Sequence, residues 1–165
     1  MKVITTPIED EIINKLNVGE MLYISGDIFC GRDAVLPYIV ESLKYMDRKE
    51  LIGSAIFHTA VSIAGVGPTS SNKLEIESSI EPLSKAGVKM HIGKGKLHED
   101  TIKALNKYNS VYAVIPPVTA LLGEKMISKE IVEHAELGME AFYKIKVVEY
   151  PIIIAVAHGR SIYDE

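Results

Sequence analysis

The sequence has few of the features that would assign it to several large functional classes. It contains one cysteine, Cys30, among 165 residues, so the chain alone forms no disulfide, no thiolate-held cluster and no cysteine-rich zinc site. It has no run of apolar residues long enough to span a bilayer. Its first seven residues lack the apolar core of a signal peptide. We therefore expect a cytoplasmic protein that makes no membrane contact.

Positive charge is also scarce, with 18 Lys and Arg against 22 Asp and Glu and a net charge of −4. This balance argues against nucleic acid as a partner. The five histidines show no His-x-x-x-His spacing, so we interpret them as surface or core residues and predict no metal site in this chain. A length of 165 residues and an apolar fraction of 47% predict one globular domain over 1–165.

Apolar patterning predicts strands and helices that alternate along the chain. Segments rich in Val and Ile predict strands at 1–7, 20–29 (which bends or runs into a functional loop at Ser25-Gly26-Asp27), 51–63 (one or two strands), 88–92, 110–115 and 151–157. Helical spacing is found at 8–16, 31–46 with Asp33 as its N-cap, 99–108 and 118–126, and in a helix after 73 that Pro82 breaks in two. Segment 127–150 gives strand signals only near its end. The alternation predicts an α/β fold with ligands at the carboxyl ends of strands.

One loop at such a position is Gly67-Pro68-Thr69-Ser70-Ser71-Asn72-Lys73. Its glycine and proline make a turn, and its hydroxyl and amide side chains can cap the helix that follows. Backbone N–H groups at a helix start favour an anion. The hydroxyl of Thr69 is therefore either a helix cap or a proton-transfer group. An ordinary capped loop explains the same residues equally well.

Two further glycine-bearing loops each carry a cation. Arg32 lies at a predicted helix start, where a cation opposes the helix dipole, so it could bind an external carboxylate or phosphate. A surface ion pair with Asp33, Asp27 or Glu41 is the alternative. Lys94 lies between Gly93 and Gly95, which allow a ligand to approach closely; a solvated turn is the alternative. With Lys73, these cations favour a small polyanion such as a dicarboxylate.

Four motifs in this order resemble the C-terminal region of class I (iron–sulfur) fumarate hydratases, which in many archaea and bacteria is a separate beta subunit. They are Ser25-Gly26 with Arg32-Asp33-Ala34, then Gly67-Pro68-Thr69-Ser70-Ser71, then Ile92-Gly93-Lys94-Gly95, and then Leu137-Gly138-Met139-Glu140-Ala141. The resemblance covers nearly the whole chain. The beta subunit of L-tartrate dehydratase is similar enough that these motifs do not separate the two.

The resemblance implies a single swivelling β/β/α domain and a partner alpha subunit in a hetero-oligomer. That partner would hold a [4Fe–4S] cluster on three cysteines, so the isolated chain is expected to be inactive. The reaction implied is the interconversion of fumarate and L-malate by addition or removal of water. Cys30 has no assigned role in this scheme.

The same resemblance implies roles for individual residues. Arg32 and Lys94 match positions that bind substrate carboxylates, and Thr69 matches the position of the base that removes a proton. Lys73 stands where the family usually has arginine, which exchanges a planar fork for a point charge. Ser70 replaces a threonine often found there. Two rival interpretations remain: a non-catalytic dicarboxylate-binding module, and a structural domain whose loops are exposed turns.

Overall fold

The computed structural model describes residues 2–61, 73–116 and 125–164 of the chain. Strands and helices alternate through most of this range, as predicted. The elements in order are β1 (Val3–Thr5), α1 (Asp10–Asn14), β2 (Met21–Cys30), α2 (Leu36–Ser42), η1 (Lys49–Leu51), β3 (Ala55–Phe57), α3 (Lys73–Lys85), β4 (Met90–Gly93), α4 (Glu99–Lys107), β5 (Val111–Val114), β6 (Met126–Glu133), η3 (Ala135–Glu140), β7 (Phe142–Ala157) and β8 (Arg160–Ser161).

The strands form one sheet that closes on itself. Their order is β1-β2-β3-β4-β5-β7-β6, with β8 on β7 and a further pairing between β2 and β7. β1 to β5 are parallel neighbours, whereas β7 runs antiparallel to β2, β5 and β6. Because β7 pairs with both β5 and β2, the strands β2, β3, β4, β5 and β7 form a closed ring. β6 extends the sheet outside this ring.

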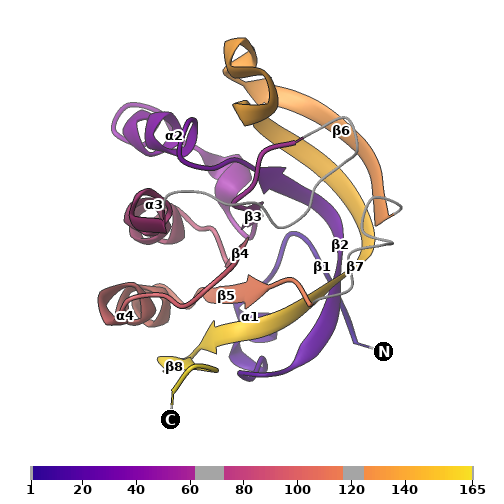
Figure 1. Cartoon of the computed structure of the whole chain (residues 1–165), viewed down its shortest axis with the longest axis vertical. Coiled ribbons are helices and arrows are strands. Elements are labelled where there is room, and N and C mark those ends of the chain that lie inside the picture. The colour runs from indigo at the N-terminus through magenta and orange to yellow at the C-terminus, as the bar shows by residue number, and fades with distance from the viewer. Residues whose placement is uncertain (1, 62–72, 117–124, 165) are drawn as a thin grey trace.

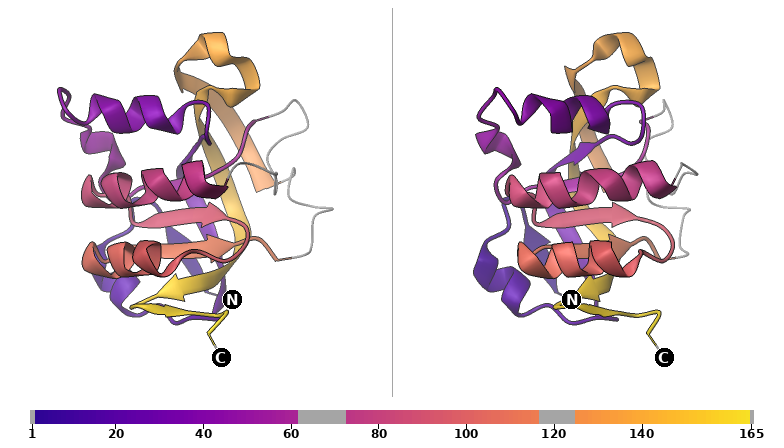
Figure 2. Two further views of the ribbon diagram at one scale, coloured as in Figure 1. Left: turned by 60° about the vertical axis from the view of Figure 1, so that its left-hand side comes forward. Right: turned by 90° about the vertical axis from the view of Figure 1, so that its left-hand side faces the viewer.

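The layers are helix, sheet and sheet, which confirms the predicted α/β class and its β/β/α arrangement. Helices α2, α3 and α4 lie side by side on the outer face of β3, β4 and β5, and β2, β7 and β6 form the opposite wall (Figure 1). Two turned views show the same stack of helices in front of the sheet (Figure 2).

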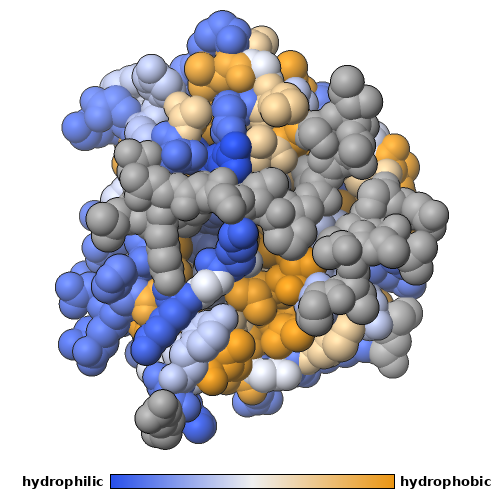
Figure 3. Space-filling view, in the orientation of Figure 1, coloured by the Kyte–Doolittle hydropathy of each residue, from blue (hydrophilic) through white to orange (hydrophobic). Residues whose placement is uncertain are grey.

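Apolar residues fill the space inside the ring and beneath each helix. The ring interior holds fully buried side chains from β2 and β7, among them Leu22, Ile24, Tyr150 and Ile152. A second cluster lies beneath α2 and α3, and a third beneath α4. In the space-filling view, charged residues cover the helix layer, whereas apolar side chains gather over β5 (Figure 3). Burial of these faces is the main force that holds the layers together.

β2 and β7 both bend where glycine and a left-handed residue interrupt their pairing. The register shifts between Ile24 and Gly26 of β2, as the sequence predicted from Ser25-Gly26-Asp27. Opposite this bulge, Glu149 of β7 has φ of 48°, and its N–H donates a hydrogen bond to the hydroxyl oxygen of Ser25 at 2.8 Å. A bulge of this kind bends a strand and increases its twist. The bend allows each strand to belong to two layers.

Two predictions about helices are wrong. α2 begins at Leu36, its N-cap is Val35 and no side chain caps it, so Asp33 is not the cap and the helix is shorter than 31–46. α3 continues through Pro82. The N–H that proline lacks would have bonded the carbonyl of Ser78, and Ser78 is an exposed residue, so the interruption costs less than in a turn of buried residues. The helix predicted at 118–126 lies almost wholly outside the described residues.

Segment 127–150, which the sequence left largely unassigned, contains most of β6, all of η3 and the first half of β7. β6 is exposed along nearly its whole length, so it lacks the regular alternation of buried and exposed residues by which a strand is recognised. Pro151 lies within β7, where proline normally argues against a central strand. These two features explain why the hairpin was missed.

Candidate functional site

The four parallel strands β2, β3, β4 and β5 end at one edge of the sheet. Their last residues are in register: Cys30 pairs with Phe57, Phe57 with Ile92, and Gly93 with Val114. α3 also begins at this edge, the end toward which the arrow of β4 points (Figure 2). In an open or closed α/β sheet, such an edge is where ligands bind.

Three of the four predicted site residues belong to this edge. Arg32 follows the end of β2 by two residues, Lys94 follows β4 directly, and Lys73 is the first residue of α3. β2 and β4 are separated by one strand, so their ends are about 10 Å apart. Thr69 lies outside the described residues. The backbone therefore places the three cations at one edge, and their meeting around Thr69 stays a prediction.

Arg32 is held by a carboxylate that the sequence did not suggest. Its Nε donates to both carboxylate oxygens of Glu140, at 2.8 and 3.0 Å, and its Nη2 also bonds Oε1. The side chains of Arg32 and Glu140 are 20% and 27% exposed. Asp33 lies 3.9 Å from the same guanidinium, so of the alternatives considered it is the one that contributes. The bond to Glu140 raises the pKa of Arg32 although partial burial opposes the rise.

η3 (Ala135–Glu140) brings Glu140 to this edge through a turn that requires glycine. Gly138 has φ of 61° and ψ of −124°, a combination that residues with a side chain rarely adopt. Directly after it, the carbonyl of Met139 accepts a hydrogen bond from the N–H of Val61 at 2.9 Å. Met139 and Glu140 therefore contact two loops of the edge, the one after β3 and the one after β2.

Lys94 is exposed and follows a glycine whose role differs from the predicted one. A side chain at Gly93 would place its Cβ 2.8 Å from the hydroxyl oxygen of Tyr112. Tyr112 is buried against α4. The lack of a side chain at Gly93 is therefore explained by packing against Tyr112, whereas the sequence suggested room for a ligand. Gly95 has φ of 87°, which the turn after Lys94 requires.

A buried polar chain lies beneath the same edge. His58, the residue after β3, has its Nε2 3.0 Å from Nδ1 of His91, and Nε2 of His91 is 2.9 Å from the hydroxyl of Ser84 in α3. Burial lowers the pKa of His58 to about 3 and lowers that of His91 well below its usual value. Both rings are therefore neutral near pH 7. Within the described residues, Nδ1 of His58 has no hydrogen-bond partner.

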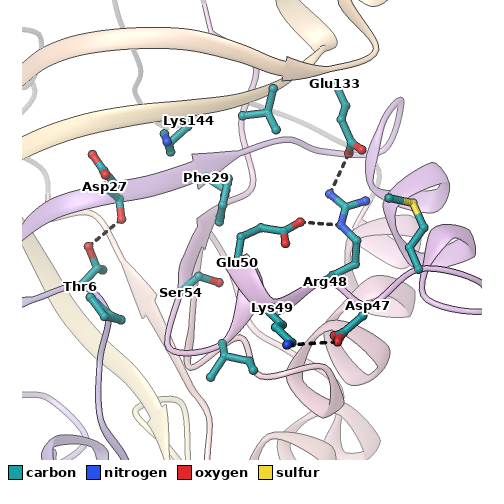
Figure 4. A pocket seen from close by; sticks show the side chains of 14 residues that line it. Thr6, Asp27, Phe29, Asp47, Arg48, Lys49, Glu50, Ser54, Glu133 and Lys144 are labelled. Atoms are coloured by element: carbon teal, nitrogen blue, oxygen red, sulfur yellow. Dashed lines mark hydrogen bonds and ion pairs between the residues drawn. The ribbon is translucent and has the colours of Figure 1, made fainter.

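A second arginine, Arg48, borders a cavity of about 600 Å³ away from the loops that carry Arg32 and Lys94. Its Nε donates to Glu50 at 2.6 Å and its Nη2 to Glu133 at 2.8 Å (Figure 4). Its Nη1 donates to the hydroxyl oxygen of Ser42 at 2.9 Å. Every nitrogen of the guanidinium thus has a protein acceptor. Arg48 ties η1 to α2 and β6, and we assign it a structural role.

The residues that the structure describes do not fit a metal cluster. Cys30 is fully buried at the end of β2, and burial raises the pKa of its thiol, which opposes the thiolate form that binds iron. Within residues 2–61, 73–116 and 125–164, no three His, Cys, Asp or Glu side chains are grouped to hold a metal ion. The helices in these ranges are also too short or too polar to cross a membrane.

The sequence is similar to known proteins along nearly its full length. It is 30% identical over 177 residues to L(+)-tartrate dehydratase subunit beta of Escherichia coli (strain K12), which covers 99% of this chain and 87% of that protein. It is 29% identical to the putative L(+)-tartrate dehydratase subunit beta of Methanocaldococcus jannaschii, over 93% of this chain and 86% of that protein. It is 27% identical to a putative fumarate hydratase class I of Geobacillus stearothermophilus, over 96% of this chain and 33% of that protein.

The family model described as Fumarase C-terminus matches residues 2–165. This match spans the three parallel-strand loops and η3, the segments in which the four sequence motifs occur. The resemblance inferred from those motifs is thereby confirmed, and the chain belongs to the Fumarase C-terminus family.

Proposed function

We propose that this chain is the beta subunit of an iron–sulfur hydro-lyase acting on a four-carbon dicarboxylate, with fumarate and L-malate as its substrate pair. Membership of the Fumarase C-terminus family supports the reaction class. The relatives' names, subunit beta of L(+)-tartrate dehydratase and fumarate hydratase class I, support both a dicarboxylate substrate and a separate partner subunit. The observation that carries the proposal is the placement of Arg32, Lys73 and Lys94 at one edge of the sheet.

In this proposal the chain supplies binding and proton transfer. Arg32 and Lys94 bind the two carboxylates of the substrate, since fixed cations favour a dianion and hold it in one orientation. The Thr69 hydroxyl oxygen takes the proton from the carbon next to a carboxylate. An unperturbed alcohol is a poor base, so the nearby cations must stabilise its deprotonated form. A [4Fe–4S] cluster on the alpha subunit would supply Lewis-acid chemistry.

L-tartrate is the second candidate substrate, and one observation favours it. The relatives that cover most of their own length are named L(+)-tartrate dehydratase, whereas the relative named for fumarate matches over a third of its length. Lys73 bears on this choice because it replaces the arginine expected from the resemblance. A lysine offers one strongly hydrated point charge, whereas arginine offers a planar pair of donors.

The test is to produce this chain together with a cluster-bearing alpha subunit, purify the pair of subunits without oxygen, and assay both acids. Hydration of fumarate supports the first choice, and turnover of L-tartrate alone supports the second. Dicarboxylate binding by the chain without turnover by the pair would indicate a non-catalytic binding module. Absence of both binding and turnover would indicate a structural domain.

The role of Thr69 has its own test in the active pair. We expect Thr69→Ala to lower kcat by about 100-fold or more while KM changes by less than about threefold, because general bases contribute on this scale. Thr69→Ser, which keeps the hydroxyl, is the matched control and should retain most of the activity. Near-normal turnover of Thr69→Ala would remove this residue from the reaction.

A further inference from the structure

We propose that Glu140 is a positioning residue for Arg32: its carboxylate fixes the guanidinium in the orientation in which Arg32 binds a substrate carboxylate. The inference rests on the proposed function, since it assigns Arg32 a substrate. The two residues are 108 positions apart in the sequence. In this role, the carboxylate fixes the orientation of the cation beside it.

The geometry of the contact is that of a clamp. Glu140 reaches Nε and Nη2 of Arg32, which lie on one side of the planar guanidinium. Two-point contact with a planar fork fixes both the plane and its rotation, which a single ion pair does not. Both side chains are mostly shielded from solvent, so the pair is screened less than one at the open surface. The Glu140 carboxylate thus determines how the rest of the guanidinium faces the edge.

The charge of Glu140 works against simple attraction of an anion. A carboxylate within hydrogen-bond distance offsets much of the positive charge that Arg32 presents to a dianion. A cation whose task was attraction alone would bind the substrate better without it. The contact with Glu140 therefore weakens the binding of the substrate by Arg32 but fixes the orientation of the guanidinium. Loss of Glu140 should accordingly change kcat more than KM.

The neighbouring residue links Glu140 to the second half of the proposed site. The carbonyl of Met139 bonds the N–H of Val61 at 2.9 Å, and Thr69 follows Val61 in the same connection between β3 and α3. The φ and ψ angles of Gly138 set the direction of both residues. η3 therefore contacts Arg32 through a side chain and Val61, which follows β3, through the backbone.

The experiment compares Glu140→Gln with Glu136→Gln in the purified pair. Glu136 is an exposed residue of the same η3 and contacts His134, so its variant controls for loss of a negative charge there. We expect Glu140→Gln to lower kcat between about 10-fold and 100-fold with KM unchanged or lower. Glu140→Asp, which keeps the carboxylate, should recover part of the loss. Glu136→Gln should leave both constants unchanged.

A second readout does not depend on activity. In the full chain, the Nε–H signal of Arg32, assigned by its loss in Arg32→Lys, should exchange slowly with water in NMR spectra of the wild type and much faster in Glu140→Gln. Fast exchange in the wild type, or normal kcat in an active pair carrying Glu140→Gln, overturns the inference. If the wild-type pair of subunits is inactive but the Arg32 Nε–H exchanges slowly, the proposed function is contradicted, whereas the fixed orientation of Arg32 by Glu140 is supported.

Discussion

Two arginines of this molecule are both held by carboxylates of the β6–η3 segment, yet they lie in different surroundings. Arg48 bonds Glu133 of β6, and its side chain is 3% exposed. Arg32 bonds Glu140 of η3, and its side chain is 20% exposed. Arg48 has acceptors from three elements, whereas Arg32 follows β2 at the carboxyl edge, where β4 ends and α3 begins. Ion pairing is therefore common to both arginines, and what separates Arg32, the proposed site residue, from Arg48 is its position at the carboxyl edge of the sheet.

The comparison predicts that removal of Arg32 lowers activity more than stability, and that removal of Arg48 lowers stability more than activity. The largest effect is expected for Arg32→Ala. This change should reduce kcat/KM of the two-subunit enzyme by about 100-fold to 1000-fold, because a charged donor to the substrate is lost. Its free energy of unfolding should fall by no more than about 1 kcal/mol, since the pair with Glu140 is partly exposed. Steady-state kinetics and urea unfolding of the same sample measure both quantities.

Arg48→Ala should show the reverse. Removing the buried guanidinium leaves Glu133 and Ser42 without their donor, and breaking such a pair costs about 3 kcal/mol of unfolding free energy. The properly folded fraction should keep its kcat. Arg48→Lys keeps the positive charge but loses the planar set of donors, so its free energy of unfolding should lie between those of the wild type and Arg48→Ala. A reduced kcat at saturating substrate in folded Arg48→Ala would indicate that Arg48 belongs to the active site, and the two arginines would then not differ in role.

A smaller effect tests whether the carboxyl edge also contains purely structural polar groups. His58 stays neutral in the folded chain because burial lowers its pKa to about 3, whereas an unfolded histidine titrates near 6.5. The unfolded state therefore binds more protons below pH 6.5, and stability is lost as pH falls from there toward 3, by up to about 1.4 kcal/mol per pH unit for each such histidine.

The measurement is urea unfolding between pH 7 and pH 4.5 for the wild type, His58→Gln and His134→Gln. The His58 variant should show a shallower decline than the wild type, although it is less stable at pH 7. His134 is partly exposed and contacts Glu136, so its variant controls for the loss of a histidine outside the buried His58–His91 pair. Equal slopes for all three proteins would show that His58 is protonated in the folded chain.

The sequence was sufficient for the fold class and for the backbone positions of Arg32 and Lys94 at the carboxyl edge, because both depend on local patterns. Alternating apolar segments define β2, β4 and β5, and glycine-bearing loops mark the ends of β2 and β4. A parallel sheet then places these ends at one edge without further information. Placement of Lys94 and Arg32 needed only this rule.

The contacts that position the site were not predictable in the same way. Glu140 and Arg32 are distant in sequence, and nothing in their local patterns identifies them as partners, although the motif Leu137-Gly138-Met139-Glu140-Ala141 marked the segment. The N-cap assignment of Asp33 failed because α2 starts three residues later, at Leu36. Leu36 and the N-cap residue Val35 are both packed in the core. Tertiary packing decided these features, and the propensities of single residues did not.

Closure of the ring by β7 has a consequence for how the protein is made. β2 emerges early in synthesis, but its longest pairing partner is β7, which ends at Ala157. The barrel-like core cannot complete its hydrogen-bonded circuit until that late strand has left the ribosome, and contacts of such long sequence separation form slowly. Glu140 lies directly before β7, so the contact between Arg32 and Glu140 likewise joins an early segment of this sequence to a late one.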